Sequence, residues 1–288
     1  MVKFEKMAEG ISLLKIPFEG IWVGIYLVEG GERMLIDSGL NAEGIDTYLI
    51  PALNERGLKA EDISVLLSTH THGDHVGGHH RFKELNPNVR VVATKKQSEK
   101  LVDPLKYNVL IRQVFPEDSP PPSAHLKGVS VDEILEEGGR IDRLTVLETA
   151  GHDSDSVCFY DEKTRTLLTG DSLQQDGTNT QGCGLYMDLA AYRASLRKLM
   201  ALDIEKIVCG HPFNPLGAIA EGKAQCREYL NFCLELTDLY DDIIKDLRTN
   251  GKEPREIATQ LIRAREGIVP KHLFLALYTV TQHLKLQN

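Results

Sequence analysis

Apolar residues in the first hundred positions form short runs, and segments with helical spacing separate these runs. Each short run, bounded by polar or turn-forming residues, predicts a strand, and each periodic segment predicts a helix. The predicted strands are residues 11–16, 21–28, 34–36, 65–67 and 89–93. The predicted helices are residues 42–55 and a segment around 78–85. The alternation of the two kinds of element indicates an α/β fold.

The same alternation returns in the second half of the chain after an interruption. Residues 104–138 break it, because several prolines stand among charged residues, and we expect there a long surface excursion that could cover a site. Apolar residues between Leu189 and Leu199 recur at helical spacing and predict a helix that packs on the sheet. Further strands are predicted at residues 144–147, 157–160, 166–168 and 207–209.

The pattern changes once more after Pro215. From there the apolar residues follow helical spacing only, and Gly and Pro residues separate the helices. We therefore place a boundary near Ala218, with an α/β domain over residues 1–217 and a small all-helical extension over residues 218–288.

Residues 69–75 read Thr-His-Thr-His-Gly-Asp-His and follow closely on a predicted strand. His70 and His72 point the same way in an extended segment, because side chains repeat every two residues. The glycine that follows permits a turn, which lets Asp74 and His75 face a second point beside the first. The alternative explanation is a solvated loop in which Asp74 caps the next helix.

Three later residues argue against that alternative, because each follows a predicted strand and a glycine. They are His152, Asp171 and His211. Residues in such places come together when strand ends converge on one edge of an α/β scaffold. The predicted metal ligands are therefore His70, His72, Asp74, His75, His152, Asp171 and His211.

This ligand set favours two divalent ions. Imidazole and carboxylate ligands without thiolate suit zinc, our first choice, and also iron or manganese. Seven ligands exceed what one tetrahedral ion can use. One ion would be held by His70, His72 and His152, the other by Asp74, His75 and His211, with Asp171 bridging them. Two ions about 3.5 to 4 Å apart can hold a hydroxide that acts as a nucleophile.

Composition and charge exclude other classes of function. The hydrophobic share of 42% is ordinary for a soluble globular protein, and no apolar stretch is long enough to span a bilayer. The net charge of -9 argues against nucleic-acid binding, which depends on Lys and Arg. Five cysteines without paired spacing predict reduced thiols. The charged amino-terminal residues lack the apolar run of a secretory signal, so we expect a cytoplasmic protein.

The ordered motifs resemble those of the metallo-β-lactamase superfamily over roughly residues 10–215. The matching pieces are Leu35-Ile36-Asp37-Ser38-Gly39, Thr69 to His75, Gly151-His152, Thr169-Gly170-Asp171 and Gly210-His211. The resemblance implies an αββα sandwich, two β-sheets packed together between outer helices, with Asp37 as a buried supporting carboxylate. In having an aspartate at position 171, the chain is similar to the glyoxalase II, lactonase and thioesterase branches. Its helical tail is similar to the carboxy-terminal module of some members.

The third motif departs from the family pattern. The family commonly continues after its histidine with Thr-Pro-Gly, whereas this chain continues with Asp153-Ser154-Asp155-Ser156. We interpret the two carboxylates as exposed turn residues. The alternative is that they orient the free ring nitrogen of His152.

Three other residues near these motifs are secondary candidates. Tyr186 and Tyr192 offer phenols that could stabilise an oxyanion, as in some lactonases of this type. The helical spacing makes Tyr192 a core residue instead, whereas Tyr186 lies in a predicted loop. His79 follows the first motif, but we expect it on a helix that turns it away from the cluster.

Together these features predict a metallohydrolase that opens an ester-like carbonyl, a thioester or lactone, by attack of a metal-bound hydroxide. Asp74 would orient the water or shuttle its proton, and Asp171 would bridge the ions. We expect a small-molecule substrate, no nucleic-acid or membrane partner, and a homodimer as one option. The alternatives are a mononuclear iron enzyme similar to persulfide dioxygenases, a nuclease or phosphodiesterase of the same fold, and a metal-containing regulatory protein.

Overall fold

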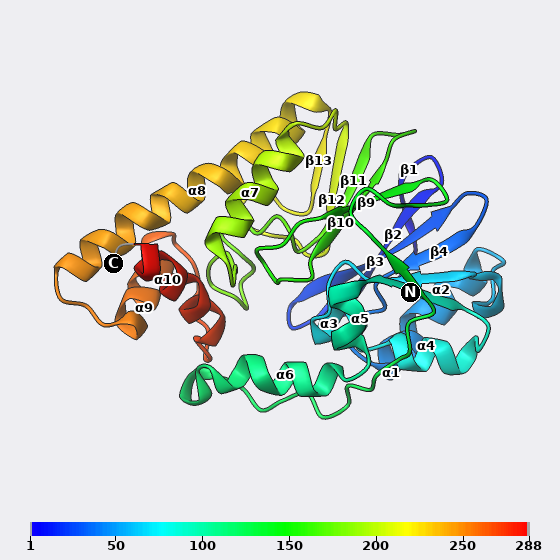
Figure 1. Ribbon diagram of the computed structural model, residues 1–288, viewed down its shortest axis with the longest axis horizontal. Coiled ribbons are helices and arrows are strands. Elements are labelled where there is room, and N and C mark those ends of the chain that lie inside the picture. The colour runs from blue at the N-terminus through cyan, green and yellow to red at the C-terminus, as the bar shows by residue number, and fades with distance from the viewer. Residues whose placement is uncertain (1, 287–288) are drawn as a thin grey trace.

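The computed structural model describes residues 2–286. Within them, two β-sheets pack face to face, and helices cover the outer side of each sheet (Figure 1). One sheet has seven strands in the order β1-β2-β3-β4-β5-β6-β7, and the other has six in the order β13-β12-β11-β10-β9-β8. The predicted αββα sandwich is confirmed.

The first sheet and its helices come from the amino-terminal half of the chain. Its strands are β1 (Glu5–Ala8), β2 (Ile11–Phe18), β3 (Ile21–Glu29), β4 (Arg33–Ile36), β5 (Val65–Leu67), β6 (Arg90–Thr94) and β7 (Glu133–Leu135). The helices are α1 (Ala42–Gly44), α2 (Ile50–Glu55), α3 (Gly73–Val76), α4 (His79–Leu85), α5 (Lys95–Leu101) and α6 (Pro104–Gln113). Strands β1 to β4 pair antiparallel through short turns, whereas β4 to β7 pair parallel, because longer segments cross over between them.

The second sheet comes from the carboxy-terminal half. Its strands are β8 (Arg140–Ile141), β9 (Leu144–Glu148), β10 (Val157–Asp161), β11 (Thr166–Gly170), β12 (Lys206–Cys209) and β13 (Ile219–Glu221). The helices of this half are α7 (Leu189–Met200), α8 (Lys223–Thr249), α9 (Pro254–Ala264) and α10 (Phe274–Leu286). Only β11 and β12 pair parallel in this sheet, and α7 lies in the connection between them.

Alternating side chains on the strands of the first sheet contribute to two separate cores. In β2 and β3, Leu13 and Tyr26 join the cluster between the sheets, whereas Leu14 and Ile25 join the cluster under α2 and α4. This alternation follows from the two-residue period of a strand. Both faces of the first sheet are buried in this way, which explains why its strands read as continuous apolar runs.

Several elements differ from the sequence-based expectation. Strands β1, β7 and β8 were not predicted, because they are short and their residues include charged ones such as Lys6, Glu133 and Arg140. The chain beyond Pro215 is not helical throughout, since β13 adds an antiparallel edge to β12. The excursion over residues 104–138 contains helix α6 and strand β7 as well as loops.

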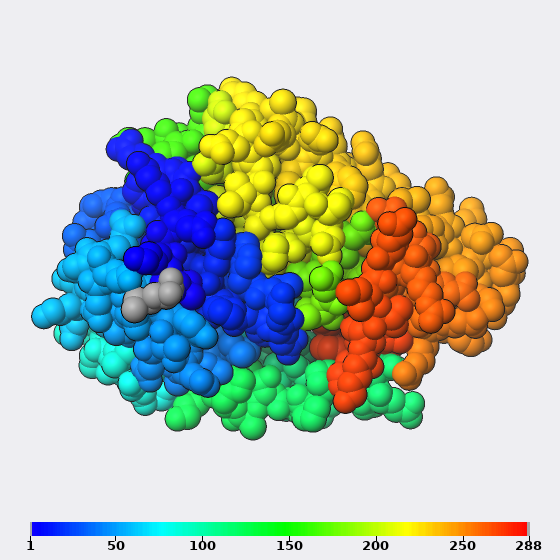
Figure 2. Space-filling model, turned by 180° about the vertical axis from the view of Figure 1, so that it is seen from behind, coloured from blue at the N-terminus to red at the C-terminus, as the bar shows by residue number. Residues whose placement is uncertain are grey.

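The carboxy-terminal helices pack on the outer face of the second sheet through α7. Leu196 and Leu199 of α7 share one apolar cluster with Tyr240 of α8, Leu261 of α9 and Leu277 of α10. Seen from behind, the orange and red carboxy-terminal surface reaches the green surface that follows α5 (Figure 2). The division at residues 217 and 218 stays a prediction. None of the helices in residues 2–286 combines the length and the apolar character needed to cross a membrane.

Candidate metal centre

The sequence-predicted ligands all lie where strands end. His70 and His72 follow β5, and Asp74 and His75 belong to the short helix α3. His152 follows β9, Asp171 follows β11 directly, and His211 follows β12. The structure brings these residues together at one edge of the two sheets. All of them are buried except His72 and Asp74, which are half-buried.

Two of the glycines that precede ligands allow the close packing of this edge. Gly151 has a φ of 145°, and a Cβ on it would lie 2.4 Å from the Cα of Tyr192. Gly170 has a φ of 48°, and a Cβ there would lie 2.3 Å from Oγ1 of Thr69. A side chain at either position would push the following ligand away from the centre.

Three histidines form the first group of ligands. His70, His72 and His152 each present one ring nitrogen, and these nitrogens lie within 4.8 Å of one another. Nε2 of His152 is 3.1 Å from Nδ1 of His72. This spacing can accommodate a cation with three imidazole ligands.

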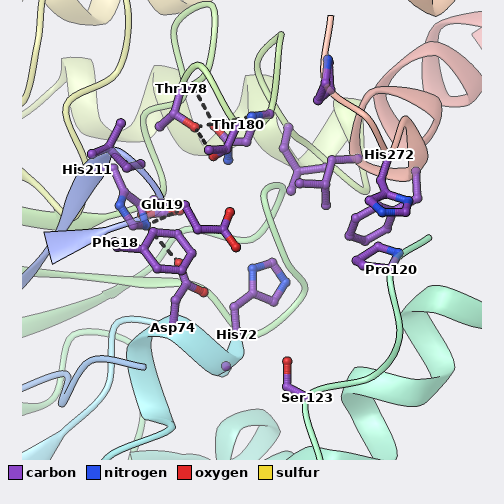
Figure 3. Close-up of a pocket in the computed structure, with 18 of the residues that line it drawn as sticks. Phe18, Glu19, His72, Asp74, Pro120, Ser123, Thr178, Thr180, His211 and His272 are labelled. Atoms are coloured by element: carbon purple, nitrogen blue, oxygen red, sulfur yellow. Dashed lines mark hydrogen bonds and ion pairs between the residues drawn. The ribbon is translucent and has the colours of Figure 1, made fainter. Parts of the chain in front are cut away.

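Asp74, His75 and His211 form the second group. Nε2 of His211 lies 3.0 Å from Oδ2 of Asp74 and 3.2 Å from Nε2 of His75. Figure 3 shows Asp74 and His211 facing each other at one side of the pocket. The ligand atoms of this group also lie within 4.8 Å of one another.

Asp171 lies between the two groups. Its Oδ2 is 3.7 Å from Nε2 of His152 in the first group and 3.7 Å from Nε2 of His211 in the second. Its Oδ1 is 3.4 Å from Nε2 of His75. The carboxylate therefore reaches ligands of both groups, which is the geometry that a bridging residue requires.

Hydrogen bonds at the far side of the imidazoles fix which nitrogen faces the centre. Nδ1 of His152 lies 3.0 Å from the carbonyl oxygen of Leu185, and Nδ1 of His211 lies 2.8 Å from that of Trp22. A carbonyl oxygen can only accept, so Nδ1 carries the proton in both rings. Nε2 is then the nitrogen of each ring that faces the centre, where a bound cation would take its lone pair in place of a proton.

Asp37 supports His75 in the way that the family resemblance implies. The Asp37 carboxylate is fully buried, and its Oδ2 accepts from Nδ1 of His75 at 2.8 Å. It also accepts from the backbone N–H of Thr69 at 2.7 Å and from the Thr69 hydroxyl at 2.8 Å. One carboxylate thus ties the start of the His-rich loop to a ligand on α3.

Unsatisfied buried atoms test whether the residues fit metal ions. Nε2 of His70 and Oδ1 of Asp171 are buried and have no hydrogen-bond partner within residues 2–286. Burying such groups unpaired costs free energy, and native structures rarely leave them so. Both atoms face the ligand groups, so bound cations would satisfy them. The residues therefore fit a metal centre.

The pKa values of His70 and His152 are lowered, whereas those of His75 and His211 are raised. Burial lowers the pKa of His152 to about 4, and burial together with the neighbouring histidines lowers that of His70 well below its usual value. Burial also lowers the pKa of His75, but the carboxylates of Asp171, Asp74 and Asp37 outweigh it and raise this pKa to about 10. A cation bound at His75 would displace a proton that these carboxylates otherwise hold there.

The carboxylates after His152 correct our interpretation of them as exposed turn residues. Asp153 and Asp155 are buried, with 1% and 2% of their surface exposed. Oδ2 of Asp153 lies 3.2 Å from Nε2 of His72, so the carboxylate is in contact with His72 and not with His152. Nζ of Lys100 lies 2.5 Å from Asp153 and 3.1 Å from Asp155. The departure from the family motif marked these residues, but nothing in the sequence indicated which ligand they contact.

The metal centre opens into a pocket of about 490 Å³. The turn after β2, with Phe18 and Glu19, forms one wall, and the loop with Thr178 and Thr180 forms another (Figure 3). The excursion after α5 contributes residues that include Ile111, Arg112, Pro120 and Ser123. The segment before α10 contributes Pro270, Lys271 and His272. The sequence indicated that the excursion could cover a site, but not which of its residues line it.

The secondary candidates lie away from this pocket. The Tyr186 hydroxyl lies 2.7 Å from Nε2 of His283, and the Tyr192 hydroxyl accepts from the backbone N–H of Gln174 at 3.0 Å. Both tyrosines are buried, and neither lines the pocket, so the oxyanion role considered for Tyr186 is wrong. His79 lies on α4 between the hydroxyls of Ser38 and Ser68, at 2.6 and 2.8 Å, and faces away from the ligands as predicted.

Comparison with known proteins agrees with this fold. The family model of the metallo-beta-lactamase superfamily matches residues 23–211. The chain therefore belongs to the metallo-beta-lactamase superfamily, and it is an enzyme of the hydrolase class, as predicted.

Three individual proteins are similar to this chain over most of its length. An acyl-coenzyme A thioesterase, MBLAC2 of Gallus gallus, is 29% identical over 236 residues, which cover 74% of this chain and 80% of the relative. The metallo-beta-lactamase family protein TTHA1429 of Thermus thermophilus has the same fold, with a TM-score of 0.76, 21% identity and coverage of 98% of this chain and 95% of that one. The protein TTHA1623, solved in a di-iron-bound form, is 26% identical with a TM-score of 0.53, and the match covers 72% of this chain and 93% of that one.

Proposed function

We propose that this protein is a binuclear metal-dependent hydrolase that cleaves a thioester or a related ester-like carbonyl. The observation that carries the proposal is the pair of ligand groups joined by Asp171, whose carboxylate reaches both. A single tetrahedral ion could not use this whole set. The ligands are those predicted from the sequence, with His70, His72 and His152 in one group and Asp74, His75 and His211 in the other.

Bound divalent ions would polarise the substrate carbonyl and lower the pKa of a water molecule. The protein's own residues prepare the site for this chemistry. Asp74 lines the pocket, and although burial raises its pKa, His75 and His211 bring that pKa below its usual range. An ionised Asp74 can accept a hydrogen bond from a water molecule and so orient it. Zinc is the proposed metal, with iron or manganese as alternatives, and the di-iron form of TTHA1623 makes iron the first of these.

Two observations favour a thioester. MBLAC2, a relative that covers most of this chain, is named as an acyl-coenzyme A thioesterase. The pocket beside the centre has apolar lining residues, among them Phe18, Ile21, Ile111 and Leu185, which suit the apolar part of an acyl compound. We also propose a small-molecule substrate and a cytoplasmic location, with a homodimer as one option.

The test is a substrate panel on the metal-loaded enzyme. We expect hydrolysis of small acyl thioesters, with weaker turnover of lactones and none of phosphodiesters, and we expect a chelator to abolish it. Turnover of phosphodiesters alone would instead establish a phosphodiesterase. Oxygen consumption with a persulfide, at one iron per chain, would establish the dioxygenase alternative. A fully metal-loaded protein without any turnover would favour a regulatory role.

A further inference from the structure

Arg112 is a cation on the pocket wall that the metal chemistry does not use. It lies near the end of α6 and lines the pocket together with His72 and Asp74. Its Nη1 donates to the carbonyl oxygen of Asn108 at 3.0 Å, and its guanidinium carbon lies 5.4 Å from the centre of the Phe274 ring. These contacts hold the side chain in place from both α6 and α10.

These contacts do not use all the hydrogen-bond donors of the guanidinium. Its Nε is buried and has no hydrogen-bond partner in the part of the chain that the structure describes. Burial lowers the pKa of Arg112, and the negative charge of Asp74 offsets only part of this shift. A partly buried cation without a close counter-charge is costly, and the guanidinium fork fits a carboxylate or a phosphate with two parallel hydrogen bonds.

Two more side chains on this wall can donate hydrogen bonds to an anion. Lys271 and His272, in the segment before α10, also line the pocket. Figure 3 shows His272 and Pro120 across the pocket from Asp74 and His211. Glu19 also projects a carboxylate into the pocket in this view, and because Glu19 and Lys271 are both exposed, solvent screens both charges, which leaves the partly buried Arg112 as the main cation of this wall. The pocket thus has carboxylates at the metal end and basic residues on the wall formed by α6 and the segment before α10.

We propose that Arg112 binds an anionic group of the substrate, a carboxylate or a phosphate, while the scissile carbonyl lies at the metal centre. The inference rests on the proposed function and narrows it to thioesters that carry a negative charge at a distance from the reacting carbon. Arg112 is on this account a residue for substrate specificity and takes no part in the chemical step.

Three matched thioesters test whether Arg112 binds a phosphate on the thiol side of the substrate or a carboxylate on its acyl side. Acetyl-pantetheine is neutral, acetyl-4′-phosphopantetheine adds a phosphate on the thiol side, and succinyl-pantetheine adds a carboxylate on the acyl side. We expect Arg112→Gln to raise KM for one of the charged compounds by roughly 10- to 100-fold, the effect of losing a charged hydrogen-bonded pair. For acetyl-pantetheine KM should change less than about twofold, and kcat should change little for all three. Arg112→Lys should restore part of the lost affinity, because it keeps the charge but not the fork.

The control is Lys106→Gln, which removes a charge from the exposed side of the same helix, away from the pocket. It should leave all three compounds unaffected. The inference is overturned if Arg112→Gln changes the neutral and the charged compounds equally, or changes none of them, while circular dichroism shows a folded variant. If Arg112→Gln does not fold, Arg112→Lys must show a smaller rise in KM that is confined to one of the charged compounds, and the absence of that rise overturns the inference.

A second measurement separates this inference from the proposed function. If the wild-type enzyme cleaves no thioester, the proposed function fails, and calorimetric titration with inorganic phosphate and with succinate then decides the inference. Weaker binding of one of these anions by Arg112→Gln than by the wild type supports the anion site. Equal binding by the two proteins, or no binding by the wild type, overturns it.

Discussion

At the scale of single residues, the orientation of each imidazole explains how a short motif becomes a metal centre. His152, His211 and His75 each bond through Nδ1 to an acceptor outside the centre, namely the carbonyl oxygens of Leu185 and Trp22 and the carboxylate of Asp37. Their Nε2 atoms are left to face the centre. His72 is reversed, with Nδ1 toward His152 and Nε2 toward Asp153.

The Asp171 carboxylate should affect both ions. We expect Asp171→Ala to lower the metal content of both ligand groups and to cut turnover by orders of magnitude, because this carboxylate reaches ligands of each group. His211→Ala should mainly empty the second group. Elemental analysis of the folded variants, with circular dichroism as a control, measures the difference. Two ions and near-normal turnover in Asp171→Ala would exclude the bridging role.

Asp153 should affect one ion only. We expect Asp153→Asn to weaken metal binding at the group of His70, His72 and His152 by roughly 10- to 100-fold, since it removes the charge that orients His72. Asp155→Asn is the matched control, because Asp155 contacts Lys100 and the Thr71 hydroxyl but no ligand. Titration against a competing chelator compares the two. Equal affinities would mean that Asp153 stabilises the loop without tuning the metal.

At the scale of elements, the sequence patterns predicted the strands that are buried on both faces. Residues 65–67 and 166–168 are apolar or small throughout and were recognised, and the ligands could be placed at their ends. The edge strands β7 and β13 could not be predicted, because Glu133 and Glu221 face solvent there and only pairing with a neighbour makes these segments strands.

A buried ion pair in the second sheet should make stability depend on pH. Burial raises the pKa of Asp161, but the hydrogen bonds and the charge from Arg143 and the hydrogen bonds from Thr164 lower it by more. The pKa of Asp161 in the folded state is therefore below its usual value. The ionised Asp161 therefore stabilises the fold above a pH of about 4, and this contribution is lost as pH falls through the lowered pKa. We expect Asp161→Asn to cost about 1 to 3 kcal/mol near pH 7 and less near pH 3.

Urea unfolding of the wild type and the variant at both pH values measures this contribution. Glu162→Gln, at the neighbouring exposed carboxylate that pairs with Arg140, serves as the control and should cost little at either pH. A cost for Asp161→Asn that does not change with pH would show that the pair contributes packing and not charge.

At the scale of the whole molecule, the pocket is assembled from parts of the chain that lie far apart in sequence. The hydroxyl of Tyr278 in α10 donates to the carbonyl oxygen of Ile111 in α6 at 2.8 Å, and the Phe115 and Tyr278 rings meet edge to face. These contacts place Arg112 and His272 in one pocket. Sequence patterns describe local periods and motifs, so they predicted the ligands but could not predict which distant segments would face them.

The central claim is that seven residues bind two divalent ions. The most direct test is native mass spectrometry of the full chain after metal loading and removal of free metal, which counts the ions on each folded molecule. We expect the wild type to carry two ions and His211→Ala to carry one, because that variant retains the three histidines of the first group. A wild-type protein that retains a single ion under the same metal-replete conditions would contradict the binuclear centre.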